Sequence, residues 1–256
     1  MAGRLDGKVA LISGGSRGQG EAHARLFVAE GARVMLGDLL HEDGEKVAAS
    51  LGEAARYEPL DVTREEDWQR IVESTTREFG RLDVLVNNAG ILRYGPLEHT
   101  PAEEYRQVVE VNQVGSFLGI KSVIPAMRAS GGGSIVNISS AAGLTGVGGV
   151  VSYASSKWAV RGMTKVAALE LGGDNIRVNS LHPGMVDTPM VARDNFDNVD
   201  QDASMQKQPI KRVARPEEMS RLVLFLASDE SAYCTGAEFI ADGGSTAGHL
   251  HEVLEE

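Results

Sequence analysis

The sequence has little cysteine, little clustered positive charge and no long hydrophobic run near its start. Of its 256 residues only Cys234 is a cysteine, so no disulfide can form within the chain, and a cytoplasmic location is expected. The 25 lysines and arginines are outnumbered by 36 aspartates and glutamates, and the formal net charge is −11. This balance disfavours nucleic acid and anionic membrane surfaces as partners. The first apolar run, residues 9–12, is too short for a signal or membrane-spanning segment.

Histidines are also few, and their spacing does not suggest a metal site. None forms a helical i, i+4 pair with a carboxylate in a recognised metal-binding arrangement. We therefore expect no metal, and we interpret His182 as support for the end of a strand. The six histidines are His23, His41, His99, His182, His249 and His251.

Short runs rich in β-branched residues alternate with longer amphipathic stretches along the whole chain. Strands that are apolar on both faces, joined by helical crossovers, are typical of a parallel sheet covered by helices on both faces. The chain is therefore expected to be one α/β domain over residues 1–256, with a Rossmann-type doubly wound parallel sheet. The predicted strands are 8–13, 33–38, 55–60, 84–87, 134–139, 177–182 and 238–241.

The segment 189–213 is the most irregular part of the sequence. It contains many aspartates and asparagines, which favour turns over regular structure. Long loops in compact domains are often lids or binding elements, although a solvated surface excursion has the same composition. We predict that 189–213 is a substrate-binding loop or lid.

A glycine-rich turn follows the first predicted strand and leads into a helical pattern. Gly14, Gly18 and Gly20 follow the spacing G-x-x-x-G-x-G, with Arg17 and Gln19 between the glycines. Glycines permit a tight turn and close backbone approach, so the helix N-terminus can face a diphosphate. A purely structural strand-to-helix turn could look the same, but the strand–turn–helix order favours a dinucleotide site.

Asp38 closes the second predicted strand and indicates which dinucleotide is bound. An acidic residue at this position accepts hydrogen bonds from the adenosine ribose hydroxyls and repels a 2′-phosphate. Arg17 is the opposing signal, because an arginine in the glycine turn could pair with that phosphate. We predict NAD as the cofactor.

Polar and small residues follow the third and fourth predicted strands. Asp61 and Val62 come after one strand, and Asn88, Ala89 and Gly90 come after the next. The carboxyl ends of parallel strands line the ligand crevice of a doubly wound sheet, so we expect these residues around adenine and ribose. For the pair 87–88 a self-bonded polar turn is an equally good interpretation.

The stretch from Tyr153 to Lys157 contains the residues that we predict to be catalytic. Residues four apart on a helix project from one face, so the Lys157 ammonium can lie near the Tyr153 phenol and lower its pKa. Such pairs are common on solvated helices. Here, however, Ser140 follows a strand predicted to be central and could hold a substrate oxygen for proton transfer to or from Tyr153.

These motifs together resemble the short-chain dehydrogenase/reductase family, over about residues 3–244. The resemblance implies a catalytic tetrad of Asn112, Ser140, Tyr153 and Lys157. One departure is Ser13, where many members have threonine; both residues carry a hydroxyl, so we expect little consequence. The matching residues are Gly14, Gly18, Gly20, Asp61, Asn88, Ala89, Gly90, Asn112, Ser140, Tyr153, Lys157, Pro183, Gly184 and the terminal Asp242, Gly243 and Gly244.

The resemblance also implies roles that residue patterns alone do not give. Asn112 would hold a water that links Lys157 to a proton relay, and Lys157 would bond the nicotinamide ribose. In the segment that begins Pro183-Gly184, the backbone of Val186 would contact the nicotinamide carboxamide, and Thr188 would reach the cofactor phosphates. The family further implies a homotetramer that pairs through the helices carrying Asn112 and Tyr153.

Several stretches look like those of the bacterial 3α,20β-hydroxysteroid dehydrogenases, which implies a hydroxysteroid or another bulky alicyclic alcohol as substrate. Small cyclic-alcohol dehydrogenases share these stretches and are the main alternative. An NADP-linked ketoacyl reductase and a non-catalytic dinucleotide-binding protein are weaker alternatives, opposed by Asp38 and by the intact tetrad respectively. The apolar residues expected around the substrate are Leu92, Leu144, Val150, Val151, Met185 and Met190.

Overall fold

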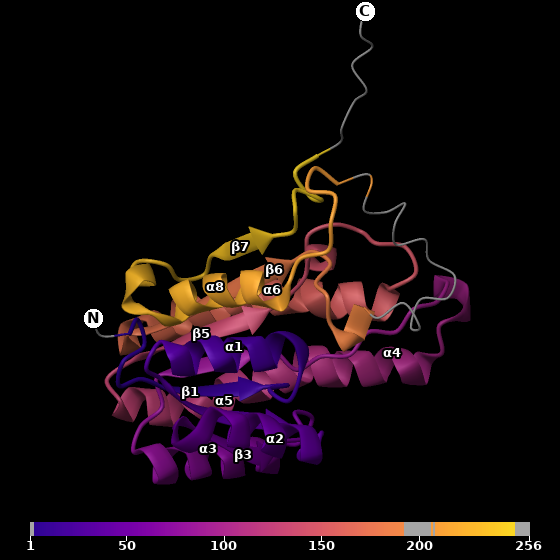
Figure 1. Cartoon of the computed structure of the whole chain (residues 1–256). Coiled ribbons are helices and arrows are strands. Elements are labelled where there is room, and N and C mark those ends of the chain that lie inside the picture. The colour runs from indigo at the N-terminus through magenta and orange to yellow at the C-terminus, as the bar shows by residue number, and fades with distance from the viewer. Residues whose placement is uncertain (1–2, 192–205, 207, 249–256) are drawn as a thin grey trace, which may run out of the picture.

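The described part of the chain is built around a seven-stranded parallel sheet (Figure 1). The computed structural model describes residues 3–191, 206 and 208–248. Each predicted strand is present, with ends within one residue of those expected, so the predicted fold class is confirmed. The strands are β1 (Val9–Ser13), β2 (Arg33–Asp38), β3 (Ala55–Pro59), β4 (Val84–Asn87), β5 (Gly133–Ile138), β6 (Ile176–Pro183) and β7 (Glu238–Ala241).

Helices cover both faces of this sheet because its strands are apolar on both sides. In β1, Ala10 and Ile12 belong to one core, and Val9 and Leu11 belong to the other. One face is covered by α1 (Gly18–Ala29), α2 (His41–Leu51) and α8 (Pro216–Ala227), and the other by α3 (Glu65–Phe79), α5 (Gly115–Ala129) and α6 (Val151–Leu171).

Shorter elements complete the fold. Helix α4 (Ala102–Val109) packs against α6 and runs through a π-helical turn, Glu110–Val114, directly into α5. None of the described helices is both long and apolar enough to cross a membrane. The described 3₁₀ turns are Gly52–Ala54, Leu97–His99, Ala141–Gly143, Gly172–Asp174, Pro189–Val191 and Asp229–Ser231.

The strand order β3-β2-β1-β4-β5-β6-β7 places the functional end of the sheet. The chain moves outward in one direction from β1 to β3 and in the other from β4 to β7, so a crevice opens beside the carboxyl end of β1. Beyond β6, a parallel bridge pairs Val186 with Ala214 and closes the base of the predicted lid. Residues 192–205 and 207 of that lid lie outside the described residues.

Candidate active site

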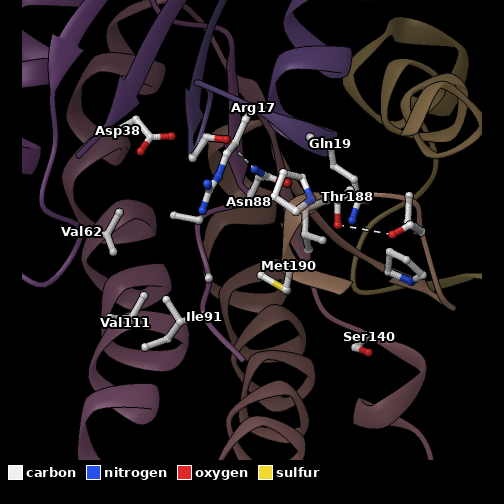
Figure 2. A pocket seen from close by; sticks show the side chains of 18 of the residues that line it. Arg17, Gln19, Asp38, Val62, Asn88, Ile91, Val111, Ser140, Thr188 and Met190 are labelled. Carbon is white, nitrogen blue, oxygen red and sulfur yellow. Dashed lines mark hydrogen bonds between the residues drawn. The ribbon is translucent and has the colours of Figure 1, made fainter. Parts of the chain in front are cut away.

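A cleft of about 350 Å³ opens at the carboxyl ends of β1 to β6 (Figure 2). Nearly all of the predicted site residues line it; Gly20 and Asn112 lie behind its wall. The predicted residues in the lining are Gly14, Arg17, Gly18, Gln19, Asp38, Asp61, Val62, Asn88, Ala89, Gly90, Ser140, Tyr153, Lys157, Pro183, Gly184, Val186 and Thr188. Sequence reasoning missed several further lining residues, whose only signal is their position beside strand ends. They are Leu39, Leu40, Leu60, Ile91, Val111, Ile138, Ser139, Pro189 and Val191.

The glycine turn after β1 has a shape that only glycine permits. Gly14 and Gly18 have positive φ angles of 65° and 58°. A Cβ atom on Gly20 would lie 2.0 Å from the carbonyl oxygen of Gly14, so only glycine fits at this position behind the turn. The N-terminus of α1 therefore faces the cleft, where free N–H groups and the helix dipole favour a diphosphate.

Hydrogen bonds of Asn88 connect this turn to the end of β4. Its side-chain nitrogen donates hydrogen bonds to the carbonyl oxygens of Ser13 and Gly14, at 3.1 and 3.0 Å. The Ser13 hydroxyl in turn accepts from the backbone nitrogens of Asn88 and Ala89. Asn87 instead donates to the side chain of Asn137, at 2.8 Å, inside the core. The pair 87–88 is thus divided between core and cleft wall, and it is not a self-bonded polar turn.

Asp38 is held in place at the end of β2 with its carboxylate in the cleft (Figure 2). One carboxylate oxygen accepts from the backbone nitrogen of Ser16, at 3.0 Å, and the other from that of Leu40, at 3.1 Å. Each oxygen keeps a lone pair for a ligand hydroxyl. The Tyr57 hydroxyl donates to the Asp38 carbonyl at 2.8 Å, and burial, followed by the charges of Asp38 and Glu45, raises the pKa of Tyr57 to about 12.

Asp61 and Val62 line the same end of the cleft. One carboxylate oxygen of Asp61 accepts from both the backbone nitrogen and the hydroxyl of Thr63, so the side chain shapes the turn before α3. Arg17 is exposed, and Figure 2 shows its side chain extending across the cleft between Asp38 and Asn88.

Tyr153, Lys157 and Ser140 meet where β5 ends against α6. The Ser140 side chain is near enough to the Tyr153 phenol to influence its pKa, and both residues line the cleft. The Lys157 ammonium lies 5.5 Å from the centre of the Tyr153 ring and donates to the carbonyl oxygen of Ile138 at 2.8 Å. The predicted juxtaposition of phenol, ammonium and serine hydroxyl is therefore present.

The pKa of the phenol differs from the expectation. We expected the Lys157 cation to lower it, but burial raises the pKa of Tyr153, and the neighbouring Ser140 side chain only partly opposes that rise. The physical reason is that the ammonium bonds the Ile138 carbonyl and lies beside the ring. Burial also lowers the pKa of Lys157 from 10.5 to about 8, so the ammonium form still predominates at neutral pH.

Ser140 is positioned by bonds that the sequence did not reveal. Its hydroxyl oxygen accepts from the backbone nitrogen of Ala142, at 3.1 Å. Its carbonyl oxygen lies 3.1 Å from Nδ1 of His182, which is fully buried on β6, while Nε2 of the same ring lies 2.9 Å from the Ser180 hydroxyl. Desolvation is the largest influence on the His182 pKa and lowers it. A neutral ring that donates through Nδ1 and accepts through Nε2 satisfies both contacts.

Asn112 lies in the π-helical turn between α4 and α5 and is fully buried. Its side-chain oxygen accepts from the Ile91 nitrogen at 2.8 Å, and its side-chain nitrogen donates to the Ile91 carbonyl and the Ser156 hydroxyl. A Cβ on Gly90 would lie 3.2 Å from this side-chain oxygen and 3.6 Å from the Lys157 nitrogen. Asn112 therefore ties the β4 loop to α6 beside Lys157.

The segment after β6 forms the wall opposite Asp38. A Cβ on Gly184 would lie 2.8 Å from the Asp242 Cα, so glycine permits the close approach of these two loops. A Cβ on Gly18 would lie 3.3 Å from the Thr188 side chain, which places Thr188 beside the glycine turn. Val186 is almost completely buried.

The predicted apolar substrate pocket is only partly present in this cleft. Met190 lines it, whereas Val150 is buried and Val151 faces a separate hollow beside α4. The remaining three apolar candidates, Leu92, Leu144 and Met185, are not part of the cleft lining. Among the described residues, no group of histidine, cysteine and carboxylate side chains could hold a metal ion.

Comparison with known proteins identifies the family. A family model described as "Enoyl-(Acyl carrier protein) reductase" matches residues 14–246. A 3-alpha-(or 20-beta)-hydroxysteroid dehydrogenase of Mycobacterium tuberculosis is 52% identical over 98% of this chain and 94% of its own length. The chain belongs to the short-chain dehydrogenase/reductase family.

Two further similarities extend this result. A trans-4-hydroxycyclohexanecarboxylate dehydrogenase of Sinomonas cyclohexanicum is 45% identical over 97% of this chain and 96% of its own length. The crystal structure of levodione reductase superposes with a TM-score of 0.91 at 35% identity, covering 96% of this chain and all of the other. The predicted family and its hydroxysteroid dehydrogenase branch are confirmed, and this short-chain dehydrogenase is an oxidoreductase.

Members of this family use nicotinamide dinucleotides, and the cleft fits such a group. Gly14, Gly18 and the first turn of α1 line the cleft, so backbone N–H groups can approach a diphosphate there. Gln19 also lines this cleft, and its side-chain oxygen is buried without a hydrogen-bond partner among the described residues.

Proposed function

We propose that the chain interconverts a secondary alcohol and a ketone with NAD(H), acting on a hydroxysteroid or another bulky alicyclic substrate. The observation that carries this proposal is that Tyr153, Ser140 and the buried Lys157 line one cleft, with the Lys157 ammonium 5.5 Å from the centre of the Tyr153 ring. Ser140 lies at the opposite end of the cleft from Asp38 (Figure 2). The bound nicotinamide supplies or accepts the hydride, and all other functions belong to side chains of the protein.

Proton transfer is assigned to Tyr153. Its raised pKa keeps the phenol protonated, which suits donation to the oxygen of a ketone as charge develops there. Ser140 orients that oxygen through its hydroxyl, and Lys157 adds a positive charge beside the ring. Asn112 positions the neighbouring loop and, by resemblance to the family, a water that connects Lys157 with solvent.

NAD is proposed over NADP because of the oriented carboxylate of Asp38. Its two oxygens are fixed by backbone donors, and no described side chain forms an ion pair with it. A 2′-phosphate would therefore meet a negative charge that no described ion pair offsets, and the Arg17 guanidinium in the same cleft is the opposing influence. By the same resemblance we assign Val186 to the carboxamide and Thr188 to the phosphates.

The substrate assignment is supported by the 52% identity to a protein named as a 3-alpha-(or 20-beta)-hydroxysteroid dehydrogenase. A small cyclic alcohol is the second candidate, favoured by the 45% identity to the trans-4-hydroxycyclohexanecarboxylate enzyme. Met190 contributes apolar surface suited to either class.

A homotetramer in the cytoplasm is the proposed working form. Large apolar side chains are exposed on α5 and α6, including Phe117 at 48%, Val166 at 55% and Leu169 at 85%. Such surface is typical of an interface between subunits. The mass of the purified chain in sedimentation equilibrium tests this assignment, and a monomer at micromolar concentration contradicts it.

A substrate panel tests the proposed reaction. Steroid ketones, monocyclic ketones and acetoacetyl thioesters are supplied with NADH and NADPH in parallel, and absorbance at the nicotinamide band is followed. Oxidation of NADH by steroid ketones is expected. Activity with monocyclic ketones alone selects the second candidate, and activity with thioesters and NADPH contradicts the proposal.

The variant Tyr153→Phe tests the proton donor. It removes one hydroxyl, so turnover should fall at least a thousandfold while NADH binding stays within about twofold. Tyr105→Phe is a matched control, because it also removes one phenolic hydroxyl, which donates to Ser155, but Tyr105 lies on α4 outside the cleft. Wild-type turnover by Tyr153→Phe contradicts the assigned role.

A further inference from the structure

The side chain of Gln19 has a feature that the proposed function does not use. Gln19 lies between Gly18 and Gly20 in the first turn of α1 and lines the cleft. Its side-chain oxygen is fully buried and finds no hydrogen-bond donor among the described residues. A buried carbonyl oxygen without a donor costs about 1–3 kcal/mol, so its retention calls for a partner that the protein itself does not supply.

The position of Gln19 narrows the choice of partner. Gly18 lies against Thr188, and Figure 2 shows Gln19 beside Thr188, well away from Asp38 and Val62. Thr188 belongs to the segment after β6 and donates a hydrogen bond to the carbonyl oxygen of Val186 at 3.3 Å. Gln19 therefore faces the middle and nicotinamide part of the cleft and lies away from its adenosine end.

The chemistry of the hydrogen bond restricts the choice of partner further. An oxygen acceptor needs a donor, and a dinucleotide diphosphate offers only acceptors at neutral pH. The adenosine donors belong at the Asp38 end of the cleft, and the hydroxyls of the second ribose belong beside Tyr153 and Lys157. The donor that remains is the amino group of the nicotinamide carboxamide.

We propose that the side-chain oxygen of Gln19 accepts a hydrogen bond from the carboxamide nitrogen of the nicotinamide, and so selects dinucleotides that carry this N–H group. The inference rests on the proposed use of NAD(H). It assigns to Gln19 a side-chain contact, in addition to the backbone contacts that a glycine turn makes with a diphosphate. The contact would help to hold the ring in one orientation for hydride transfer.

Equilibrium binding with a modified dinucleotide tests this contact without any turnover. In the modified compound an acetyl group replaces the carboxamide, so the acceptor carbonyl stays while the N–H donors are lost. Dissociation constants for the reduced forms of NAD and of this analogue are measured by fluorescence titration. The proteins are the wild type, Gln19→Met and Gln19→Glu. Gln69→Met, an exposed position on α3, is the matched control.

Methionine keeps the length of glutamine and removes the acceptor. Gln19→Met should weaken NADH binding about tenfold, the value of one hydrogen bond to a buried partner, and leave analogue binding within about twofold. Glutamate keeps an acceptor but adds charge near the diphosphate. Gln19→Glu should therefore weaken both compounds while preserving the wild-type preference for NADH over the analogue. Gln69→Met should change neither affinity.

Other results would overturn the inference. Equal weakening of both compounds by Gln19→Met would mean that the side chain only supports the glycine turn. Unchanged affinity for both would mean that the buried oxygen meets a water. If Gln19→Met does not fold, Gln19→Glu alone still tests the contact. Loss of the preference for NADH over the analogue in this variant would contradict it. Absence of NADH binding by the wild type would overturn the proposed function itself, and is thus distinguishable from failure of this inference.

Discussion

Replacing Lys157 should make the protein more stable as it becomes inactive. The side chain is 4% exposed, and burial lowers its pKa from 10.5 to about 8. Keeping a proton on this buried amine costs about 3 kcal/mol of folding free energy at neutral pH. Lys157→Met removes that cost and loses the hydrogen bond to the Ile138 carbonyl, worth about 1 kcal/mol. The variant should be more stable than the wild type by about 2 kcal/mol at pH 7.

The pH dependence of this gain in stability follows from the direction in which the Lys157 pKa is shifted. Between about pH 8 and pH 10.5 the unfolded chain binds a proton at Lys157 that the folded chain has released, so wild-type stability rises with pH over this window. At about pH 9.5 the cost has fallen to about half its value at pH 7, and the advantage of Lys157→Met should nearly vanish. Lys157→Met has no titrating group at this position, so this contribution to the pH dependence of its stability is absent.

Urea unfolding without dinucleotide, at one fixed protein concentration, measures both quantities. Fluorescence of the buried Trp68 reports the transition, and equal slopes in the two proteins are needed for comparison. Lys46→Met, on an exposed part of α2, should change stability by less than about 0.5 kcal/mol. If Lys157→Met is less stable than the wild type at pH 7, or if their difference does not change with pH, the reasoning is wrong.

Two further predictions concern the ends of the cleft. Asp38→Asn keeps an acceptor for the backbone donors but removes the charge, so the preference for NAD over NADP should fall at least tenfold in steady-state kinetics. The control Asp43→Asn, at an exposed position on α2, should leave this preference unchanged. An unaltered preference in Asp38→Asn would refute the electrostatic argument. His182→Phe removes the donor to the Ser140 carbonyl, so kcat should fall about tenfold with NADH affinity within twofold, whereas parallel loss of both would indicate general damage to the fold.

The sheet could be predicted from the sequence because each strand is buried on both faces. In β1 all five residues, Val9–Ser13, are buried, so the run is apolar throughout and ends where the glycine turn begins. The prediction for β6 fell one residue short at each end. Polar His182 is buried there and Pro183 still pairs with Ala241, neither of which local preference reveals. The π-helical turn at 110–114 could not be predicted, because a single turn of five residues is too short to show a period of its own.

The candidate site was predictable in composition but not in its bonds. Spacing places Tyr153 and Lys157 on one helical face, yet it cannot state that the ammonium bonds the Ile138 carbonyl. Which acceptor the ammonium bonds depends on where β5 ends relative to α6. The expected lowering of the Tyr153 pKa was wrong for the same reason, since the balance of burial and charge depends on distances of a few ångströms.

The end of the β5–β6 ladder explains why polar side chains gather at this point. The last paired residues are Ile138 and Leu181, so carbonyl oxygens at and beyond this pair must find other donors. Lys157 donates to the Ile138 carbonyl, the His182 ring contacts that of Ser140, and Arg161 donates to that of Gly143 at 2.9 Å. The fold thus requires buried donors where the sheet ends, and the cleft opens at the same edge. A lysine that satisfies a strand-end carbonyl is then already beside the phenol that we propose as the proton donor.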